Sequence, residues 1–318
     1  MAANRHLVIL NPIAGKGRAA ERIPEVEALL AARKIDYELR LTTGVWNAAE
    51  LAREAAREGF RTVVAAGGDG TVNEVVNGLM LSRERGDRIP SMGVLAVGRG
   101  NDFCYGADIP EELGPCVDAL AGGLARPLDV GRVVGGDYPQ GRHFVNGLGA
   151  GFDTIVGLEA ARMTRVHGGM AYVLGALKTF ALFPPAPEVR VTYEGGEIAT
   201  KSHQVSIMNG KRLGGSFFYA PWAENHDGLL DLMVSDELSR GRMISLILSI
   251  GKGEHGGRPD LSFARAASIR IEAPGGGLVV HADGETICTD GKSLLVECLP
   301  ARIELICSPG LHPARPRR

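Results

Sequence analysis

Several features that would point to particular classes of protein are missing from this sequence. Aromatic residues make up only 5% of the 318 residues, and the formal net charge is −2. The chain therefore has neither the stacking surface nor the positive field with which proteins bind nucleic acid, and we expect no such partner. The eight histidines include no H-E-x-x-H spacing, so nothing in the sequence indicates zinc.

Cysteine and long apolar runs are also scarce. The five cysteines are odd in number and have no C-x-x-C spacing, which is typical of reduced thiols in a cytosolic protein. The longest apolar stretch, Met170 to Phe183, contains Lys178 and falls short of the roughly 20 residues that span a bilayer. The N-terminus leads into an apolar run of strand length and not into a signal peptide. The expected location is the cytoplasm, with peripheral contact with a membrane left open.

The most informative stretch runs from Thr62 to Asn77. Its first five residues are small or β-branched and predict a buried strand. The glycines around Asp69 predict a tight turn, and the spacing of Thr71 and Glu74 predicts a capping box at the start of a helix. A glycine turn before a helix N-terminus offers free amides and a positive dipole end to a phosphate. Asp69 in such a turn could face a magnesium ion or a transferring phosphoryl group.

Strands and helices alternate at short intervals up to residue 127. This alternation predicts a Rossmann-like α/β domain with a parallel sheet, whose ligands bind beyond the carboxyl ends of the strands. Glycine-rich loops at residues 11–18, 67–70 and 98–103 all follow predicted strands. The predicted strands are residues 6–10, 37–42, 60–66 and 92–96, and the predicted helices include 19–33, 48–58 and 71–81.

The pattern changes after residue 127, where short strands recur at near-regular spacing. Such spacing predicts an all-β sandwich with a few helices. We therefore expect a nucleotide-binding domain over residues 1–127, a β-sandwich domain over 128–312 and a basic tail over 313–318. The predicted strands include residues 188–193, 204–208, 229–234, 268–271, 278–281, 293–298 and 302–306, and the predicted helices are 170–183 and 239–250.

Several motifs in a fixed order carry a resemblance to a known family. In the first domain they are Asn11-Pro12 with Gly15-Lys16-Gly17, then Gly67-Gly68-Asp69-Gly70-Thr71, then Gly98-Arg99-Gly100-Asn101-Asp102-Phe103. In the second they are Asn209 with Gly214-Gly215, Ala220-Pro221, the segment Asp227 to Asp231, and Asp283-Gly284-Glu285. Over essentially its whole length the chain resembles the bacterial lipid kinases of the diacylglycerol kinase and YegS-like group, which are related to sphingosine kinases.

The resemblance implies an ATP-dependent phosphoryl transfer to a lipid hydroxyl, with magnesium, in the cleft between the two domains. The acceptor would be diacylglycerol-like or sphingoid and would be met transiently at a membrane surface, and a homodimer stays open. The metal ligands would be the Asp227 carboxylate and the main-chain carbonyl oxygens of Glu224 and Leu229, with Asp69 and Asp102 as further magnesium candidates. ATP would contact Asn11, Pro12, Ile13, Ala14, Gly15, Thr42, Gly67, Gly68, Asp69, Gly70, Thr71, Val72, Asn73, Glu74, Arg99, Asn101 and Asp102.

The resemblance also proposes the catalytic residues. Glu285 would be the general base that takes the proton from the lipid hydroxyl, and Asp69 is a rival for that role. Asp283 precedes Glu285 by two residues, so in an extended strand both side chains would point into the cleft. From the residues alone, a plain surface turn over residues 282–285, Ala-Asp-Gly-Glu, is an equally good interpretation. At Arg99 the sequence departs from the family, which often has a threonine there.

Two other enzyme classes remain as alternatives. NAD kinase-like enzymes share the Gly-Gly-Asp-Gly-Thr turn, although the segments around Asp227 and Asp283 favour the lipid branch by resemblance. A dinucleotide-dependent oxidoreductase would use Gly15, Gly17 and Ala20 as a G-x-G-x-x-A motif. The second predicted strand ends without the acidic residue that would hold a ribose, which argues against that class.

Overall fold

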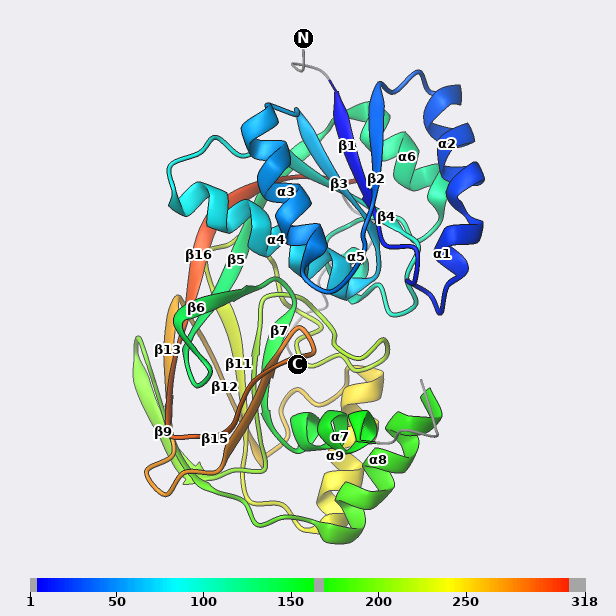
Figure 1. The fold of residues 1–318 in the computed structure, drawn as a ribbon. Helices are drawn as coiled ribbons and strands as arrows, with labels where there is room; N and C mark the ends of the chain where they lie inside the picture. Colours follow the sequence, from blue (N-terminus) through cyan, green and yellow to red (C-terminus); the bar gives the residue numbers. More distant parts are fainter. Residues whose placement is uncertain (1–4, 163–168, 309–318) are drawn as a thin grey trace.

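The computed structural model describes residues 5–162 and 169–308, which form two stacked domains. In Figure 1 the blue-to-cyan N-terminal domain lies above a second domain that is built mainly of strands. The predicted basic tail, residues 313–318, lies outside the described residues. The predicted fold class, an α/β domain with a parallel sheet followed by a domain of antiparallel strands, is confirmed.

The N-terminal domain is a parallel sheet between two layers of helices. Its strands lie in the order β2-β1-β3-β4, and all three neighbouring pairs are parallel. The strands are rich in small and β-branched residues, and the side chains of β1 and β3 are almost entirely buried. The strands are β1 (His6–Leu10), β2 (Tyr37–Leu41), β3 (Thr62–Gly67) and β4 (Ser91–Ala96), and the helices are α1 (Arg18–Glu21), α2 (Ile23–Ala32), α3 (Asn47–Glu58), α4 (Asp69–Glu84), α5 (Asp102–Gly106) and α6 (Leu113–Gly122).

The start of α4 differs from the sequence prediction. The helix begins at Asp69, inside the glycine turn, and its N-cap residue Gly68 has no side chain with which to cap it. The predicted capping box is therefore wrong. Thr71 Oγ1 instead accepts a hydrogen bond from Asn11, and Glu74 accepts one from the amide of Ala48, so both side chains serve tertiary contacts.

The second domain packs two sheets face to face. A six-stranded antiparallel sheet has the order β12-β11-β10-β7-β14-β15, and the strands β16, β13, β8 and β9 continue the N-terminal sheet into this domain. The apolar side chains between the two sheets form a core separate from that of the first domain. The strands are β5 (Ala125–Gly135), β6 (Tyr138–Phe144), β7 (Gly147–Gly151), β8 (Glu188–Tyr193), β9 (Gly196–Lys201), β10 (Gln204–Met208), β11 (Leu230–Ser235), β12 (Leu261–Ala266), β13 (Ser268–Glu272), β14 (Leu278–Ala282), β15 (Glu285–Gly291) and β16 (Ser293–Ile306).

The long strand β16 joins the two domains through a shared sheet. It replaces the two strands predicted over residues 293–306 and pairs with β5 along most of its length. Its register shifts between Leu299 and Ile303, and near its end Leu305 pairs in parallel with Met92 of β4. The C-terminal part of the chain thus returns to the N-terminal sheet.

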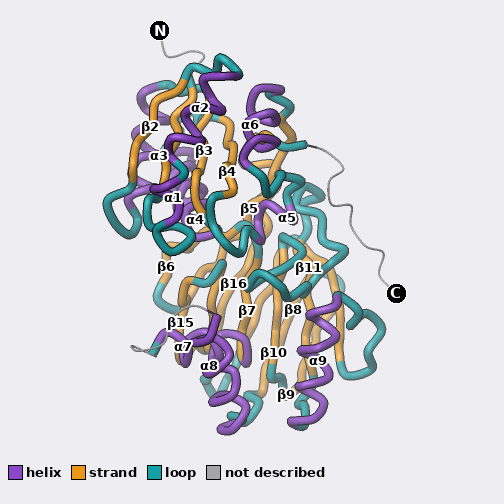
Figure 2. Tube along the Cα trace, turned by 90° about the vertical axis from the view of Figure 1, so that its right-hand side faces the viewer, coloured by secondary structure: helices purple, strands orange, loops and turns teal. Residues whose placement is uncertain are grey.

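Three helices cover the outer face of the six-stranded sheet. They are α7 (Phe152–Ala161), α8 (Gly169–Leu182) and α9 (Arg240–Lys252), of which α7 was not predicted. Figure 2 shows α7 and α8 on one side and α9 on the other, with strands β7 and β10 between them. In the described part of the chain no helix combines the length and the apolar character needed to cross a membrane.

The close packing of α3 on α4 depends on a glycine. A side-chain carbon on Gly78 would lie 2.3 Å from the carbonyl oxygen of Ala49 and 2.9 Å from its Cα. We predict that Gly78→Ala lowers the free energy of unfolding by about 1–3 kcal/mol, because the two backbones must separate. Urea unfolding followed by circular dichroism measures this change.

A matched control is available in α6. A side-chain carbon on Gly114 would meet nothing within 4 Å. Gly114→Ala should leave stability unchanged or raise it by up to about 1 kcal/mol, because alanine restricts the unfolded chain. Equal stabilities of the two variants would contradict the packing argument.

Candidate active site

Three glycine-rich loops meet at the N-terminal end of α4. A side-chain carbon on Gly98 would lie 2.3 Å from the Cα of Gly68, and one on Gly15 would lie 3.1 Å from the Val97 carbonyl oxygen. Gly15 also has a φ of +63°, which other residues adopt only with strain. The loops after β1, β3 and β4 therefore come into backbone contact only because these positions are glycine.

Several predicted nucleotide contacts lie in or beside these loops. Asn11 Nδ2 donates to Thr71 Oγ1 over 3.3 Å, which ties the first loop to α4. Thr42 follows β2, and its amide donates to the Leu10 carbonyl oxygen over 2.9 Å. Glu74 holds the start of α3 and lies one turn along α4. These residues surround the helix N-terminus, whose first amides have no partner within the helix.

Other predicted nucleotide contacts are placed differently. The side chains of Ile13 and Arg99 are exposed, and Val72 lies in the hydrophobic core, so that only its main chain can face a ligand. Asn73 points away from the glycine loops and toward the second domain. The nucleotide site therefore remains a prediction, and the residues in and beside the three glycine loops are the ones placed to form it.

Asp69 and Asp102 stand at the starts of two helices and face each other across Gly100. A side-chain carbon on Gly100 would lie 2.9 Å from Asp69 Oδ2 and 3.9 Å from Asp102 Oδ2. Asp69 Oδ1 accepts a hydrogen bond of 2.9 Å from the amide of Phe103. Asp69 Oδ2 and the Asp102 carboxylate are hard oxygen ligands that would suit a magnesium ion completed by water or phosphate oxygens, and Asp102 would then share its charge with Arg212 and the amide of Gly215.

Asp102 is the more deeply buried of the two carboxylates. Burial and the neighbouring charge of Asp69 raise the pKa of Asp102 to about 6, although the amide of Gly215 and the guanidinium of Arg212 act in the opposite direction. Arg212 Nε lies 2.9 Å from Asp102 Oδ1, and its guanidinium stacks 4.2 Å from the ring centroid of Tyr105. Sequence reasoning missed Arg212, because nothing local distinguishes it from a solvated arginine.

The predicted metal site in the second domain has a different character. One carboxylate oxygen of Asp227 pairs with the guanidinium of Arg265, and the other accepts from the amide of Leu229 over 3.0 Å. Glu224 is exposed. In the two described segments no three His, Cys, Asp or Glu side chains gather into a metal site, whereas the expected site has one carboxylate and two main-chain carbonyl oxygens. A cation on Asp227 would have to displace Arg265, so this magnesium site remains a prediction with an unfavourable starting geometry.

Asp283 connects the second domain to α4. Its carboxylate accepts from the amides of Val145, Asn146 and Gly147 over 2.8–3.0 Å and from Asn73 Nδ2 over 2.9 Å. Burial raises the pKa of Asp283, while these hydrogen bonds act to lower it. Both carboxylate oxygens of Asp283 accept hydrogen bonds from protein donors, so this side chain holds the two domains together and is not placed to bind a ligand.

Glu285 lies on the other side of a hairpin turn from Asp283. The expectation of an extended stretch is wrong, because β14 ends at Ala282, β15 begins at Glu285, and Asp283 has a φ of +48°. The Glu285 side chain is 54% exposed, and one of its oxygens lies 4.0 Å from Arg142 Nη2. The two acids therefore differ in surroundings, and only Glu285 is open to a ligand.

A second polar pair, which the sequence did not reveal, lies near this turn. His281 Nε2 lies 3.3 Å from Asp153 Oδ2, and His281 Nδ1 accepts from the amide of Gly284 over 3.2 Å. Because Nδ1 is an acceptor, Nε2 carries the proton toward Asp153. Asp153 starts α7 and His281 ends β14, so only the folded chain brings them together.

One large cavity connects these groups. Its volume is about 660 Å³, and it is lined both by Asp69, Asp102, Asp153 and His281 and by apolar side chains of α7 and α9. Asp283, Gly284 and Thr286 also line it, which places Glu285 beside its wall. The apolar part is formed by residues such as Phe152, Val156, Leu213, Leu246 and Ile250. The cavity thus has a carboxylate-rich end and an apolar end.

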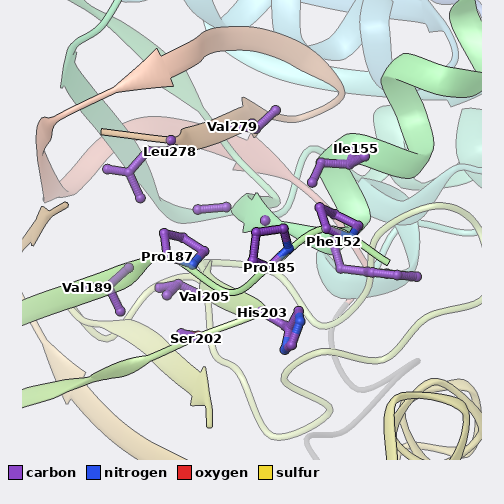
Figure 3. A pocket seen from close by; sticks show the side chains of 14 residues that line it. Phe152, Ile155, Pro185, Pro187, Val189, Ser202, His203, Val205, Leu278 and Val279 are labelled. Atoms are coloured by element: carbon purple, nitrogen blue, oxygen red, sulfur yellow. The ribbon is translucent and has the colours of Figure 1, made fainter. Parts of the chain in front are cut away.

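A smaller cavity lies on the other side of Phe152. Figure 3 shows Pro185, Pro187, Phe152 and His203 around it, and its volume is about 150 Å³. Its lining includes none of the predicted site residues. The chemistry therefore belongs to the larger cavity.

Two family models match the chain, and together they cover most of it. The model described as the diacylglycerol kinase catalytic domain matches residues 5–133, and that of the YegS C-terminal NAD kinase beta sandwich-like domain matches residues 146–307. The Bacillus subtilis (strain 168) protein named diacylglycerol kinase is 30% identical over 84% of this chain and 85% of its own. An Escherichia coli protein named "probable lipid kinase YegS" is 29% identical over 93% of this chain and 94% of its own.

Solved structures agree on the fold. A diacylglycerol kinase from Bacillus anthracis has a TM-score of 0.75 at 24% identity, covering 97% of this chain and 98% of its own. Yeast NADH kinase in complex with NADH is more distant, with a TM-score of 0.50 at 11% identity, covering 95% of this chain and 82% of its own. The two family models and the Bacillus subtilis relative together show the class, which is that of the lipid kinases. The chain belongs to the bacterial family of diacylglycerol kinases and YegS-type lipid kinases.

The raised pKa of Asp102 predicts a pH dependence of stability. A carboxyl whose pKa is higher in the folded than in the unfolded state stabilises the fold at low pH and loses that contribution as pH rises to about 6. The stability of the wild type relative to Asp102→Asn should therefore fall between pH 4 and pH 7, by up to about 3 kcal/mol. Urea unfolding of both proteins in metal-free buffer measures the difference, and a constant difference would contradict the assignment.

The role of Asp283 predicts a large loss of stability in Asp283→Asn. Asparagine tolerates the positive φ, but its NH₂ group would face amide donors, so we expect a loss of about 2–4 kcal/mol. Asp137→Asn is the control, because Asp137 is exposed on the β5–β6 turn and should change stability by less than about 0.5 kcal/mol. Equal urea midpoints for the two variants would show that Asp283 is not an anchor.

Proposed function

We propose that this chain transfers the γ-phosphate of ATP to the hydroxyl group of a lipid in the cleft between its two domains. The observation that carries the proposal is the cavity itself, which has Asp69 and Asp102 at one end and the apolar side chains of α7 and α9 at the other. Such a cavity suits an acceptor with a long apolar body and one reacting polar group. The acceptor is diacylglycerol-like or sphingoid.

The residues of the chain have distinct roles in this proposal. The glycine loops and the N-terminus of α4 hold the phosphates through main-chain amides. Asp69 and Asp102 would hold a magnesium ion, which would supply positive charge to offset the negative charge on the phosphates. Glu285 takes the proton from the acceptor hydroxyl. Arg142 Nη2 donates to Asn73 Oδ1 over 3.2 Å and lies 4.0 Å from a Glu285 carboxylate oxygen, so that it helps to position the base.

An NAD kinase-like function is the alternative, because such enzymes share the turn at Asp69 and yeast NADH kinase has a distantly similar fold. Its acceptor would be a polar dinucleotide, whose ribose and phosphates need many hydrogen-bonding partners. Phe152, Val156 and Leu246 would face that acceptor with apolar groups. The composition of the cavity therefore favours the lipid.

The proposal predicts a selective defect in Glu285→Gln. The glutamine keeps the shape but cannot take a proton, so we expect kcat for a detergent-dispersed diacylglycerol to fall by about 100-fold or more. Stability should not change, because the side chain is exposed. Transfer of labelled phosphate from Mg-ATP measures the rate.

Glu194→Gln is the matched control, since Glu194 is exposed on the β8–β9 turn. It should keep full activity. Full activity in Glu285→Gln together with loss in Asp69→Asn would assign the base to Asp69 instead. If the wild type labels no lipid alcohol in a total lipid extract, the proposed reaction is refuted.

A further inference from the structure

The hairpin turn that precedes Glu285 is attached to its surroundings at two points. Asp283 and Gly284 join β14 to β15, and both have a positive φ, of +48° and +88°, as a two-residue type I′ turn requires. The Asp283 carboxylate ties the turn to the amides of residues 145–147. The Gly284 amide donates to His281 Nδ1 over 3.2 Å, which is the second attachment. The backbone that carries Glu285 therefore takes its position from both contacts.

The Glu285 side chain is held mainly by this backbone. It is 54% exposed, and its carboxylate lies 4.0 Å from Arg142 Nη2, which is beyond hydrogen-bonding distance. A movement of the turn therefore moves the carboxylate with it. A general base has to lie within hydrogen-bond reach of the proton that it removes. The contacts that hold the turn thus decide whether Glu285 can serve as the base.

The ring of His281 is oriented by Asp153. His281 Nε2 lies 3.3 Å from Asp153 Oδ2, and the two side chains are only 15% and 14% exposed. Asp153 is itself fixed at the start of α7, because its Oδ1 accepts from the amide of Thr154 over 2.6 Å and its own amide donates to Gln204 Oε1 over 3.1 Å. One nitrogen of the ring thus faces a fixed carboxylate, and the other faces the Gly284 amide.

The neighbouring strand leaves room for this pair. Gly149 of β7 lies beside His281 in the sheet. A side-chain carbon on Gly149 would come within 2.6 Å of His281 Nε2 and closer still to Asp153 Oδ2. The imidazole and the carboxylate therefore occupy space that only glycine at this position leaves open.

We propose that His281 is a positioning residue for Glu285, which it holds in place through the Gly284 amide while Asp153 fixes the ring. The inference rests on the proposed function, because it takes Glu285 to be the base. A neutral imidazole with its proton on Nε2 satisfies both contacts, since Nε2 donates toward Asp153 and Nδ1 accepts from Gly284. Both ring nitrogens are engaged within the protein, so His281 acts on the reaction through the turn.

The two contacts of the ring respond in opposite ways to protonation. Burial lowers the pKa of His281, but Asp153 and Asp283 raise it, and the net direction is upward. A proton on Nδ1 strengthens the attraction to Asp153, yet it makes Nδ1 a donor that faces the donor Gly284 N–H. The attachment to Gly284 therefore holds above the pKa of His281 and is released as the pH falls through it.

The groups around His281 leave it as the member of the pair that titrates near neutral pH. Although burial acts to raise it, the pKa of Asp153 is lowered by His281, so the carboxylate stays ionised. Burial and Asp153 raise the pKa of Tyr219 well above its usual value, so its hydroxyl stays neutral. In the sheet His281 lies between Gly149 and Thr286, which carry no charge.

Two amide substitutions separate the two contacts of the ring. His281→Asn places an amide oxygen where Nδ1 stands and can still accept from Gly284, but it is too short to reach Asp153. We expect it to keep kcat within about threefold of the wild type, because the bond to the turn survives. His281→Gln places an amide nitrogen where Nε2 stands and leaves the Gly284 amide without its acceptor. It should lower kcat by about tenfold or more at unchanged KM for ATP, because a displaced base slows the chemical step.

Phosphorylation of detergent-dispersed diacylglycerol by Mg-ATP measures these rates, and urea unfolding checks that both variants keep the fold. The opposite ranking, with the glutamine variant active and the asparagine variant impaired, would show that only the contact with Asp153 matters. Equal losses in two folded variants would assign a direct role to the imidazole. Full activity in both would make the bond to Gly284 dispensable. Each of these three results overturns the inference.

The pH profile gives a readout that a purely structural role would not change. The activity of the wild type divided by that of His281→Asn should fall as the pH is lowered from about 8.5 to about 5.5, because only the wild type has a titrating ring at this position. Titration of ATP, Glu285 and Asp283 affects both proteins alike and cancels in the ratio. A ratio that does not depend on pH would contradict the proposed switch at Nδ1.

Nitrogen NMR of protein with isotope-labelled histidine tests the bond without turnover. The Nδ1 signal of His281, identified by its loss in His281→Gln, should be that of an unprotonated nitrogen at high pH and should gain its proton at the pH where the activity ratio falls. An Nδ1 that stays protonated throughout would overturn the inference. If the wild type phosphorylates no lipid alcohol, the proposed function fails, and this spectrum still decides whether His281 holds the turn.

Discussion

The carboxylate of Asp283 is the interaction on which the arrangement of the site depends. It draws three consecutive amides of residues 145–147 and the side chain of Asn73 to one point. Asn73 lies in α4, about one turn after the glycine turn at residues 67–70, and Asp283 lies in the hairpin turn that precedes Glu285. The distance between the glycine turn at residues 67–70, which is proposed to bind phosphate, and the proposed base Glu285 is therefore set by a buried, fully hydrogen-bonded carboxylate, which tolerates little displacement.

The shared sheet restrains the same geometry on a larger scale. Strand β16 pairs with β5 and β13 in the second domain and reaches β4 in the first, so the domains are joined by strand pairing as well as by side chains. Asn77 adds to this joint by bonding both the amide and the carbonyl oxygen of His143. A cleft formed in this way is largely pre-formed, which suits a reaction that depends on positioning and charge.

The helices α7, α8 and α9 give the second domain its functional character. Without them one face of the six-stranded sheet would be an exposed apolar surface. Their inner faces enclose a cavity that reaches the carboxylates of the first domain, while α8 and α9 also carry exposed apolar side chains such as Leu177 and Leu248. These helices thus shape the space in which the proposed acceptor would lie.

The sequence by itself determined the fold class, the glycine loops and many strands, because local periodicity and glycine placement report directly on backbone geometry. The strands at Glu188–Tyr193 and Gln204–Met208 have the predicted bounds, and the family follows from the order of motifs. Only the tertiary structure decided that Thr71 and Glu74 make no capping box and that Asp283 is an anchor. It alone joined Asp153 to His281 and Arg212 to Asp102. These contacts join residues up to 210 positions apart, as Asn73 and Asp283 are, and no local pattern encodes such separations.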